Sequence, residues 1–289
     1  MSVSVFRVLF LGEIVGKGGV FCVKSLLSEF KKEREIDFVI ANGEGATGGY
    51  GIGKNHAVYL HKLGIDVITS GECIFYKKDM VSFIQGAPYI LRPANYPQGI
   101  PGRGWWIYTH EKRKIAVINM LGQSGFNRTH LSNPFNFLPD LVTRVRRDTN
   151  TIIVDFHAAT TAEKYNMFHL ADGSVSAVIG THTKALTGDE QILPGGTGIL
   201  CDAGRTGSAD SVGGLDPEIE INKYLYKIPE RSRDAWKDLE MQGVLLDIGE
   251  NGKTESIELV REKCLEVPDA GNSNSNGSSG GQNNRKNSA

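Results

Sequence analysis

The feature that most constrains this chain is a series of short apolar runs rich in β-branched residues. The runs are "FRVLFLG", "DFVIANG", "DVITSG", "KIAVINMLG", "TIIVDFH", "SAVIGTH" and "TGILCDAG". Nearly continuous apolar runs of this length are typical of strands that are covered on both faces. Between the first three runs lie "VFCVKSLLSEFKKEREI" and "KNHAVYLHKLG", in which apolar residues recur every three or four positions, as in amphipathic helices. This alternation predicts parallel strands joined by right-handed helical crossovers.

One stretch departs from this alternation. In "GWWIYTHEKRKIAVIN" two apolar runs flank a charged turn, which predicts an antiparallel hairpin. We therefore expect an α/β fold with a mixed sheet, or two packed sheets with outer helices. The length of 289 residues suits one large α/β domain or two small ones.

The end of the chain has a different composition. From about Gly271 the sequence "GNSNSNGSSGGQNNRKNSA" contains no large apolar residue, so it cannot bury enough surface to offset the entropy of ordering. We expect a single domain over residues 1–268 and a disordered tail rich in Gly, Ser and Asn over residues 269–289.

Composition excludes several classes of protein. Lys and Arg (32) nearly balance Asp and Glu (33), which gives a formal net charge of -1. This balance argues against a protein that coats nucleic acid or an anionic membrane, but it does not exclude a local basic patch. The four cysteines form no C-x-x-C pair, which favours a reduced, cytoplasmic protein. The first apolar run contains Arg7 and is short, so it suits a core strand better than a signal sequence, and no other stretch predicts a membrane span.

Polar residues stand where the predicted strands end. In α/β proteins ligands gather at the carboxyl edge of the parallel strands. A single strand-end glutamate usually caps a helix or faces water, and a lone histidine is usually structural, so the set as a whole carries the inference. The residues that follow successive runs are Glu13, Glu44, Glu72 with Cys73, His157, His182 with Lys184, and Asp202.

Carboxylate and imidazole ligands suit a divalent transition metal such as iron, manganese or zinc. Such metals catalyse phosphoester hydrolysis, because they generate hydroxide and hold the phosphoryl oxygens. The strand-end set therefore predicts a metal-dependent phosphoesterase.

A rival motif is "GEGATG", residues 43–48, a literal G-x-G-x-x-G that follows a strand. It could bind a nucleotide cofactor, with Glu72 at the next strand end in the place of a ribose-binding acid. However, "GYGIG" separates the motif from the next predicted helix, whereas a bound pyrophosphate needs that helix amino terminus close by.

The order of the motifs resembles the bacterial YmdB-like metallophosphoesterases, calcineurin-type enzymes described as 2′,3′-cyclic-nucleotide 2′-phosphodiesterases. The resemblance covers roughly residues 5–215. It rests on "FLGEIVGKGG", "VIANGEGATGGYGI", "LGIDVITSGECIFYKKD", "LRPANYPQGIPGRG", "AVINMLGQ", "IIVDFHAATTAEK" and "SAVIGTHTKALTGDEQILPGGTGILCDAGRTG". It implies a double-sheet sandwich with α/β/β/α layers, a dinuclear metal centre that is commonly iron, and a homo-oligomer.

This chain departs from the family at several positions that would bind metal. The family has Asp, Asn, Asn, His and His where this chain has Glu13, Gly45, Glu72, Cys73 and Lys184. The resemblance implies that one metal pocket is retained, built from Glu44, Glu72, His157 and His182. The other pocket, at Glu13, Gly45 and Lys184, is expected to be lost, since a protonated lysine cannot ligate.

Two functions follow from this altered site. In the first, the protein is a phosphodiesterase with weak or altered activity on a phosphodiester or nucleotide ligand. It holds one metal ion or none, and Lys184 stabilises the phosphoryl charge. In the second, it is a non-catalytic regulatory or scaffold protein with a protein partner. That reading is favoured because Cys73 replaces the proton-donating histidine. We expect Lys184 to pair with Glu13; the alternative is a lysine that points into solvent.

Overall fold

The computed structural model describes residues 5–126 and 131–265, and in them the strands form two sheets. The first sheet has the order β2-β11-β12-β1-β3-β4, with β13 paired to β12, and the second has the order β5-β6-β7-β8-β10-β9. The first sheet contains β1 (Phe6–Leu11), β2 (Glu13–Ile14), β3 (Phe38–Asn42), β4 (Val67–Thr69), β11 (Arg205–Ser208), β12 (Leu239–Ile248) and β13 (Thr254–Lys263). The second contains β5 (Trp105–His110), β6 (Arg113–Leu121), β7 (Thr151–His157), β8 (Ala177–Thr181), β9 (Gln191–Ile192) and β10 (Gly198–Leu200).

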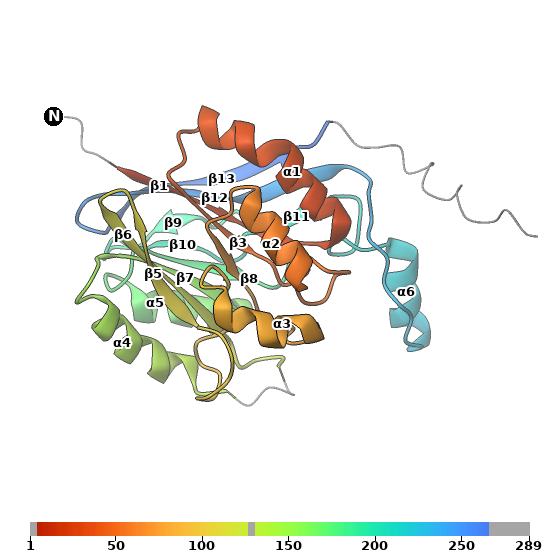
Figure 1. Cartoon of the computed structure of the whole chain (residues 1–289), viewed down its shortest axis with the longest axis horizontal. Helices are drawn as coiled ribbons and strands as arrows, with labels where there is room; N and C mark the ends of the chain where they lie inside the picture. The colour runs from red at the N-terminus through yellow and green to blue at the C-terminus, as the bar shows by residue number, and fades with distance from the viewer. Residues whose placement is uncertain (1–4, 127–130, 266–289) are drawn as a thin grey trace, which may run out of the picture.

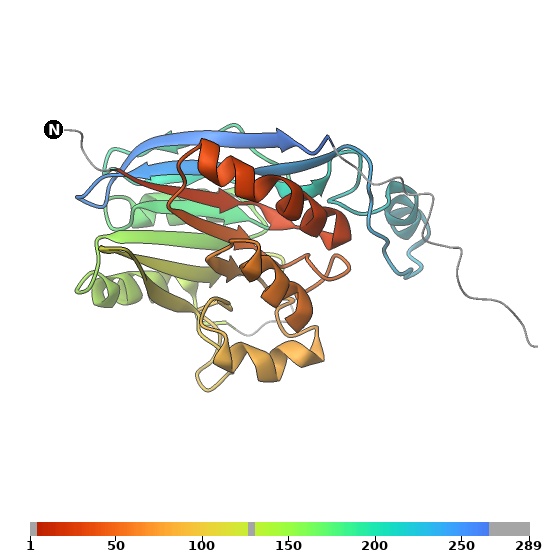
Figure 2. The same cartoon turned by 45° about the horizontal axis from the view of Figure 1, so that its top comes forward.

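The two sheets face each other, and helices cover their outer faces (Figures 1 and 2). Helices α1 (Gly16–Glu33) and α2 (Lys54–Lys62) lie on the first sheet, and α4 (Pro134–Val145) and α5 (Thr161–Ala171) lie on the second. The short helices α3 (Lys78–Phe83) and η1 (Ile84–Gly86) follow β4, and α6 (Pro217–Tyr226) projects from one end of the molecule. The predicted α/β double-sheet sandwich is therefore confirmed.

Strand β1 shows why its sequence suits the middle of a sandwich. Its residues alternate between two cores: Val8 and Phe10 pack between the sheets, whereas Leu9 and Leu11 pack under the outer helices. All four are fully buried. A strand with both faces covered needs apolar residues at every position, which is what the continuous runs predicted.

The predicted pairings of the first strands and the hairpin are confirmed. Strand β3 pairs in parallel with both β1 and β4, and β5 pairs antiparallel with β6. A second hairpin was not predicted: β12 pairs antiparallel with β13 along one edge, and along its other edge it pairs with β1 through residues 243–248 and with β11 through residues 239 and 240. Its signal was the "GENGK" turn between two apolar runs.

Two further predictions concern membrane spans and the end of the chain. In residues 5–126 and 131–265, no helix is both long enough and apolar enough to cross a bilayer. The disordered tail predicted for residues 269–289 lies outside the described residues.

The topology gathers the polar strand ends. Strands β1, β3 and β4 run in parallel in one sheet, and β6, β7 and β8 run in parallel in the other. The loops after β3, β4, β7 and β8 meet at the carboxyl edge of the sandwich, where side chains from both sheets come into contact.

Candidate metal centre

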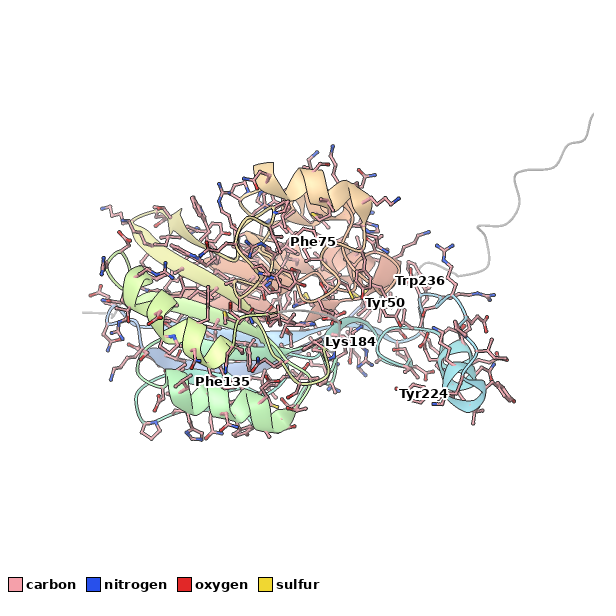
Figure 3. All side chains as sticks on the ribbon, turned by 90° about the horizontal axis from the view of Figure 1, so that it is seen from below. Tyr50, Phe75, Phe135, Lys184, Tyr224 and Trp236 are labelled. Carbon is pink, nitrogen blue, oxygen red and sulfur yellow. The ribbon has the colours of Figure 1, made fainter. Side chains whose placement is uncertain are left out.

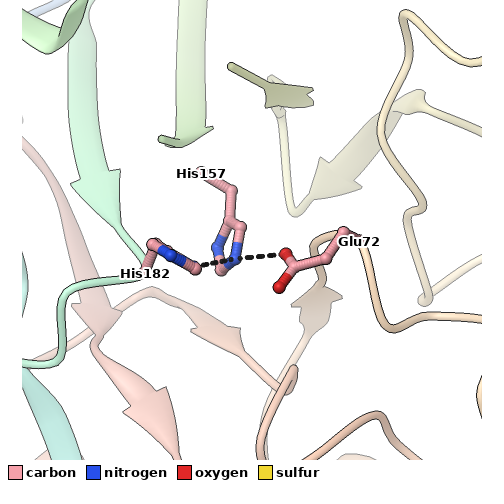
Figure 4. A group of neighbouring side chains, drawn as sticks. All are labelled: Glu72, His157 and His182. Carbon is pink, nitrogen blue, oxygen red and sulfur yellow. Dashed lines mark hydrogen bonds and ion pairs between the residues drawn. The ribbon is translucent and has the colours of Figure 1, made fainter. Parts of the chain in front are cut away.

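Glu44 and Glu72 follow two neighbouring strands of the first sheet. Glu44 is buried, and its carboxylate accepts hydrogen bonds from the backbone N–H of Gly71, at 2.7 Å, and of Cys73. Because both oxygens of Glu44 are used in this way, the carboxylate ties the loop after β3 to the loop after β4. Glu72 lies between Gly71 and Cys73, the two residues whose backbone N–H groups bind Glu44, and its side chain is directed at the second sheet (Figure 4).

Two imidazoles come from the second sheet. His157 is the last residue of β7, and His182 follows the end of β8. The Nε2 atom of His157 lies 3.2 Å from Oε2 of Glu72 and 3.1 Å from Nδ1 of His182 (Figure 4). Ligand atoms of Glu72, His157 and His182 lie within 4.8 Å of one another, and so do those of Glu44, Glu72 and Cys73. Glu72 belongs to both groups, whereas Glu44 is grouped with Glu72 and Cys73 and not with the two histidines, so among the described residues the four expected ligands do not form one group.

A buried polar network holds His157. The Thr181 hydroxyl donates to Asp155 at 2.7 Å, so its oxygen accepts from the Nδ1–H of His157 at 2.8 Å. Asn42 donates to Asp155 at 3.0 Å and accepts from the backbone N–H of Glu44, also at 3.0 Å. Since Nδ1 carries a proton in this arrangement, the Nε2 lone pair of a neutral His157 faces the centre, which is the orientation that a metal ligand needs.

The carboxylates and imidazoles perturb one another. Burial lowers the pKa of His157, but the hydrogen bond and the charge of Glu72 outweigh it and raise the pKa to about 9. For Glu72, burial would raise the pKa, but His157 lowers it to about 2. Burial raises the pKa of Glu44 to about 7, and burial together with the charge of His157 lowers that of His182 to about 4.

The residues of the other expected pocket also lie together. Glu13, in β2, is buried, and its Oε1 lies 2.9 Å from Nζ of Lys184. This is the ion pair expected from the sequence, so the alternative of a lysine in solvent is wrong. A Cβ atom on Gly45 would lie 2.6 Å from the same Oε1 and 3.0 Å from the Ile14 carbonyl oxygen. The Glu13 carboxylate therefore fills the space that a side chain at position 45 needs.

The loop that carries His182 and Lys184 has an unusual backbone, since their φ angles are 100° and 61°. Residues other than glycine adopt such angles only when their surroundings hold them there. Asp202 accepts from the backbone N–H and the hydroxyl of Thr183, at 2.9 and 2.7 Å. Lys164, which is fully buried, donates to the same carboxylate oxygen at 2.9 Å. This buried pair fixes the loop beneath the centre.

Sequence reasoning missed part of this machinery. Asp202 stood among the strand-end residues, but Asn42, Asp155, Thr181 and Lys164 did not. The signal for the first three was a polar residue inside an apolar strand, because a buried polar side chain there must have hydrogen-bond partners. Lys164 gave no such signal, since a lysine on a helix usually faces solvent.

The residues present fit a metal ion in chemistry and charge. In a tetrahedral site with bonds of ~2.1 Å, neighbouring ligand atoms lie about 3.4 Å apart, a few tenths of an ångström more than the 3.1 and 3.2 Å separations around Nε2 of His157. Glu13, Glu44 and Glu72 are three acidic side chains beside the single ammonium of Lys184, so a divalent cation would offset carboxylate charge at this edge. Oε2 of Glu72 is buried and has no hydrogen-bond partner in the described residues beyond its ion-pair contact with His157.

The "GEGATG" stretch, residues 43–48, contributes Glu44 to the candidate metal centre. Helix α2 begins at Lys54, well after Gly48, so no helix amino terminus follows the third glycine. Glu44 of this motif instead binds the loop after β4. The geometry thus gives no support to a cofactor site of the dinucleotide type at residues 43–48.

Comparisons with known proteins agree with the geometry. The family described as "YmdB-like protein" matches residues 9–260. A relative from Bacillus subtilis (strain 168), named 2′,3′-cyclic-nucleotide 2′-phosphodiesterase, is 36% identical over 247 residues, which are 86% of this chain and 93% of that protein.

Solved structures are similar as well. A structure described as a novel phosphatase from Mycoplasma pneumoniae superposes with a TM-score of 0.85 at 30% identity, over 90% of this chain and 94% of that one. The NAD nucleotidase of Haemophilus influenzae matches with a TM-score of 0.61 at 12% identity, over 91% of this chain and 57% of that one, which indicates a shared fold alone. The match over nearly the whole sandwich, and the identity to a relative of almost equal length, show that the chain belongs to the YmdB-like protein family.

Proposed function

We propose that this protein is a metal-dependent phosphodiesterase that acts on 2′,3′-cyclic nucleotides with one metal ion per chain, and that its activity is weak or altered. The observation that supports a single metal is the Glu13–Lys184 ion pair, with the Lys184 ammonium 2.9 Å from the Glu13 carboxylate. That ammonium supplies, in place of a second cation, the positive charge that the clustered carboxylates need. Glu44, Glu72, His157 and His182 would hold the metal, and their carboxylate and imidazole groups suit iron, manganese or zinc.

The reaction adds water to the cyclic phosphate: the water oxygen bonds to phosphorus, the P–O2′ bond breaks, and O2′ gains a proton. When bound, the metal supplies Lewis-acid polarisation and lowers the pKa of water. Thr181 holds His157 so that Nε2 faces the centre, and the backbone N–H groups of Gly71 and Cys73 orient Glu44. Lys184 contributes positive charge beside the phosphoryl group.

Proton donation to the leaving oxygen is the weak step. Burial, and then the charges of Glu44 and Glu72, raise the pKa of the Cys73 thiol above its ordinary value. A thiol with a raised pKa is a poorer acid and a weak hydrogen-bond donor, and a well-placed general acid typically contributes about 10²–10⁴-fold to the rate. Slow turnover is the expected consequence.

The second candidate is a non-catalytic regulatory or scaffold protein on the same fold, which Cys73 and Lys184 favour. Metal analysis of the purified protein, combined with hydrolysis of 2′,3′-cyclic AMP, separates the two. The phosphodiesterase proposal expects about one metal per chain, lost in His157→Ala, and measurable hydrolysis that falls with the metal. A metal-free protein with no hydrolysis above the rate of His157→Ala would support the scaffold.

A repaired variant provides the matched control. It carries Glu13→Asp, Gly45→Asn, Glu72→Asn, Cys73→His and Lys184→His. We expect it to bind a second metal and to hydrolyse the cyclic nucleotide much faster than the natural protein. Equal rates for the two proteins would contradict the proposal of an impaired centre. The homo-oligomer, the protein partner, the cytoplasmic location and the single domain over residues 1–268 stay predictions.

A further inference from the structure

A large cleft lies beside the metal centre, between the start of α1, the loop after β3 and the segment before β12. Its volume is about 1090 Å³. Its lining includes Lys17, Tyr50, Lys77, Arg231, Arg233 and Trp236. Pockets for small ligands usually occupy about 300–1,000 Å³. The cleft is thus larger than a mononucleotide needs.

The cleft is positively charged in a chain whose formal net charge is only -1. Within the described residues, the side chains of Lys17, Lys77, Arg231 and Arg233 have no ion pair or hydrogen bond. One lining acid, Asp234, is already used, because its carboxylate accepts from the backbone N–H of Lys17 at 2.9 Å. The other lining acid is Glu230, so the four free cations outnumber the acids of the cleft.

The cleft adjoins the metal centre through the loop that follows Glu44. The backbone N–H of Gly16, at the start of α1, donates to the carbonyl of Gly45 at 3.0 Å. A Cβ atom on Gly51 would lie 2.7 Å from the carbonyl oxygen of Cys73, so the loop rests directly on the residue next to Glu72. Tyr50 lines the cleft together with Trp236 and is also a neighbour of Lys184; in the view of Figure 3 its label falls between the other two.

Cations interleaved with aromatic rings are the chemistry that binds single-stranded nucleic acid. Tyr50 is 45% exposed, and Trp236 is half-buried against Phe21, with ring centroids 6.1 Å apart. The rings offer faces on which bases can stack, and the free cations can neutralise the phosphates between them.

We propose that this cleft binds the nucleotides that precede the cyclic phosphate of a short RNA, so that the substrate class is oligoribonucleotides with a 2′,3′-cyclic phosphate end. The inference rests on the proposed function. A cyclic phosphate terminates an RNA at its 3′ end, so the rest of the chain leaves through the 5′ oxygen of the last nucleotide. The cleft beside the centre receives that extension, whereas a cyclic mononucleotide leaves the cleft unfilled.

The test measures binding and hydrolysis separately. Binding uses fluorescence anisotropy of a labelled six-residue oligoadenylate that ends in a 3′-phosphate, the reaction product, so it does not depend on turnover. Hydrolysis compares kcat/KM for the cyclic-phosphate oligoadenylate and for 2′,3′-cyclic AMP. The variant is Arg231→Glu with Arg233→Glu. The matched control, Lys112→Glu with Arg147→Glu, makes the same charge change at exposed positions in the β5–β6 turn and after α4.

We expect the cleft variant to bind the oligoadenylate at least tenfold more weakly at low salt, while the control binds almost as the natural protein does. The slope of log affinity against log salt should fall by about 1.4, since each lost phosphate contact on a single strand contributes roughly 0.7. The ratio of kcat/KM for the oligonucleotide to that for the mononucleotide should fall by a similar factor. Tyr50→Ala should weaken binding about tenfold and Tyr50→Phe little, because a phenylalanine ring still stacks.

The outcomes separate the two proposals. Equal weakening by the control, or an oligoadenylate that binds no more tightly than 3′-AMP, overturns the RNA cleft and leaves the cyclic phosphodiesterase intact. Binding that depends on Arg231 and Arg233 without hydrolysis of either substrate supports the cleft and overturns the proposed function. Equal binding of an acidic peptide of the same charge overturns the nucleic-acid assignment.

Discussion

Replacing Gly45 with asparagine tests the origin of the altered centre most directly. The new Cβ atom would lie 2.6 Å from Oε1 of Glu13, 3.0 Å from the carbonyl oxygen of Ile14 and 3.2 Å from Cγ2 of Val15. Ordinary contacts begin near 3.4 Å, so Glu13 must move. The movement pulls its carboxylate away from Lys184, whose Nζ lies 2.9 Å from it in a buried setting.

The expected cost follows from two effects. Overpacking of a well-filled interior costs about 1–3 kcal/mol, and loosening a buried ion pair adds to it, because breaking such a pair outright costs about 3–5 kcal/mol. We therefore expect Gly45→Asn to lower the free energy of unfolding by about 2–4 kcal/mol. In Gly45→Asn with Glu13→Asp, the carboxylate withdraws by one methylene and the contact is relieved. The double variant should thus cost less than the sum of the single variants by about 1–2 kcal/mol.

Urea denaturation of the four proteins in this cycle measures the coupling. Gly48→Asn is the matched control: a Cβ atom on Gly48 meets nothing within 4 Å, and asparagine tolerates its φ of 67° better than most residues do. The reasoning is wrong if Gly45→Asn costs no more than Gly48→Asn. It is equally wrong if the effects of Glu13→Asp and Gly45→Asn add to within about 0.5 kcal/mol.

Three further predictions concern the same edge of the sandwich. Lys184→Met should lower the free energy of unfolding by about 3–5 kcal/mol, because Glu13 is left buried without a counter-charge. Adding Glu13→Gln should restore much of this loss in urea denaturation. If Lys184→Met alone costs less than about 1 kcal/mol, the ion pair does not hold the loop. Asp155→Asn should weaken metal binding about 10–100-fold in a chelator competition. Without the carboxylate of Asp155 to accept its proton, the Thr181 hydroxyl no longer holds His157 in the orientation that a ligand needs. An unchanged metal affinity would contradict the role assigned to this network. The melting temperature of the metal-free protein should fall as pH rises from about 6.5 to about 9. The fold raises the pKa of His157 from 6.5 to about 9, so protonated His157 contributes its full stabilisation below pH 6.5 and loses it as the pH rises to about 9. The fold also raises the pKa of Glu44 to about 7, and deprotonation of Glu44 therefore lowers stability as the pH rises to about 7. A melting temperature that rises across this range would refute the charge assignment, and the metal-loaded protein is the control.

The sequence by itself determined the class of fold and most of the candidate ligands. Apolar runs such as "VLFL" and "IIV" encode strands that are covered on both faces, since the pattern of burial is written locally into the chain. Parallel strands bring their carboxyl ends to one edge, so the sequence places Glu44, Glu72, His157 and His182 at the same edge of the fold. The Glu13–Lys184 pair could also be expected from the charges.

Only the tertiary structure decided which groups surround the candidate ligands Glu44, Glu72, His157 and His182. Asn42 and Asp155 hydrogen-bond across two different sheets, and Glu13 fills the space next to Gly45 because β2 lies against the loop after β3. The cationic cleft joins Lys17 to Arg231 and Arg233, more than two hundred residues along the chain. No local pattern carries such information, because these contacts depend on how the two sheets and their loops pack. Periodicity determines which face of an element is buried, and packing determines which neighbour it meets there.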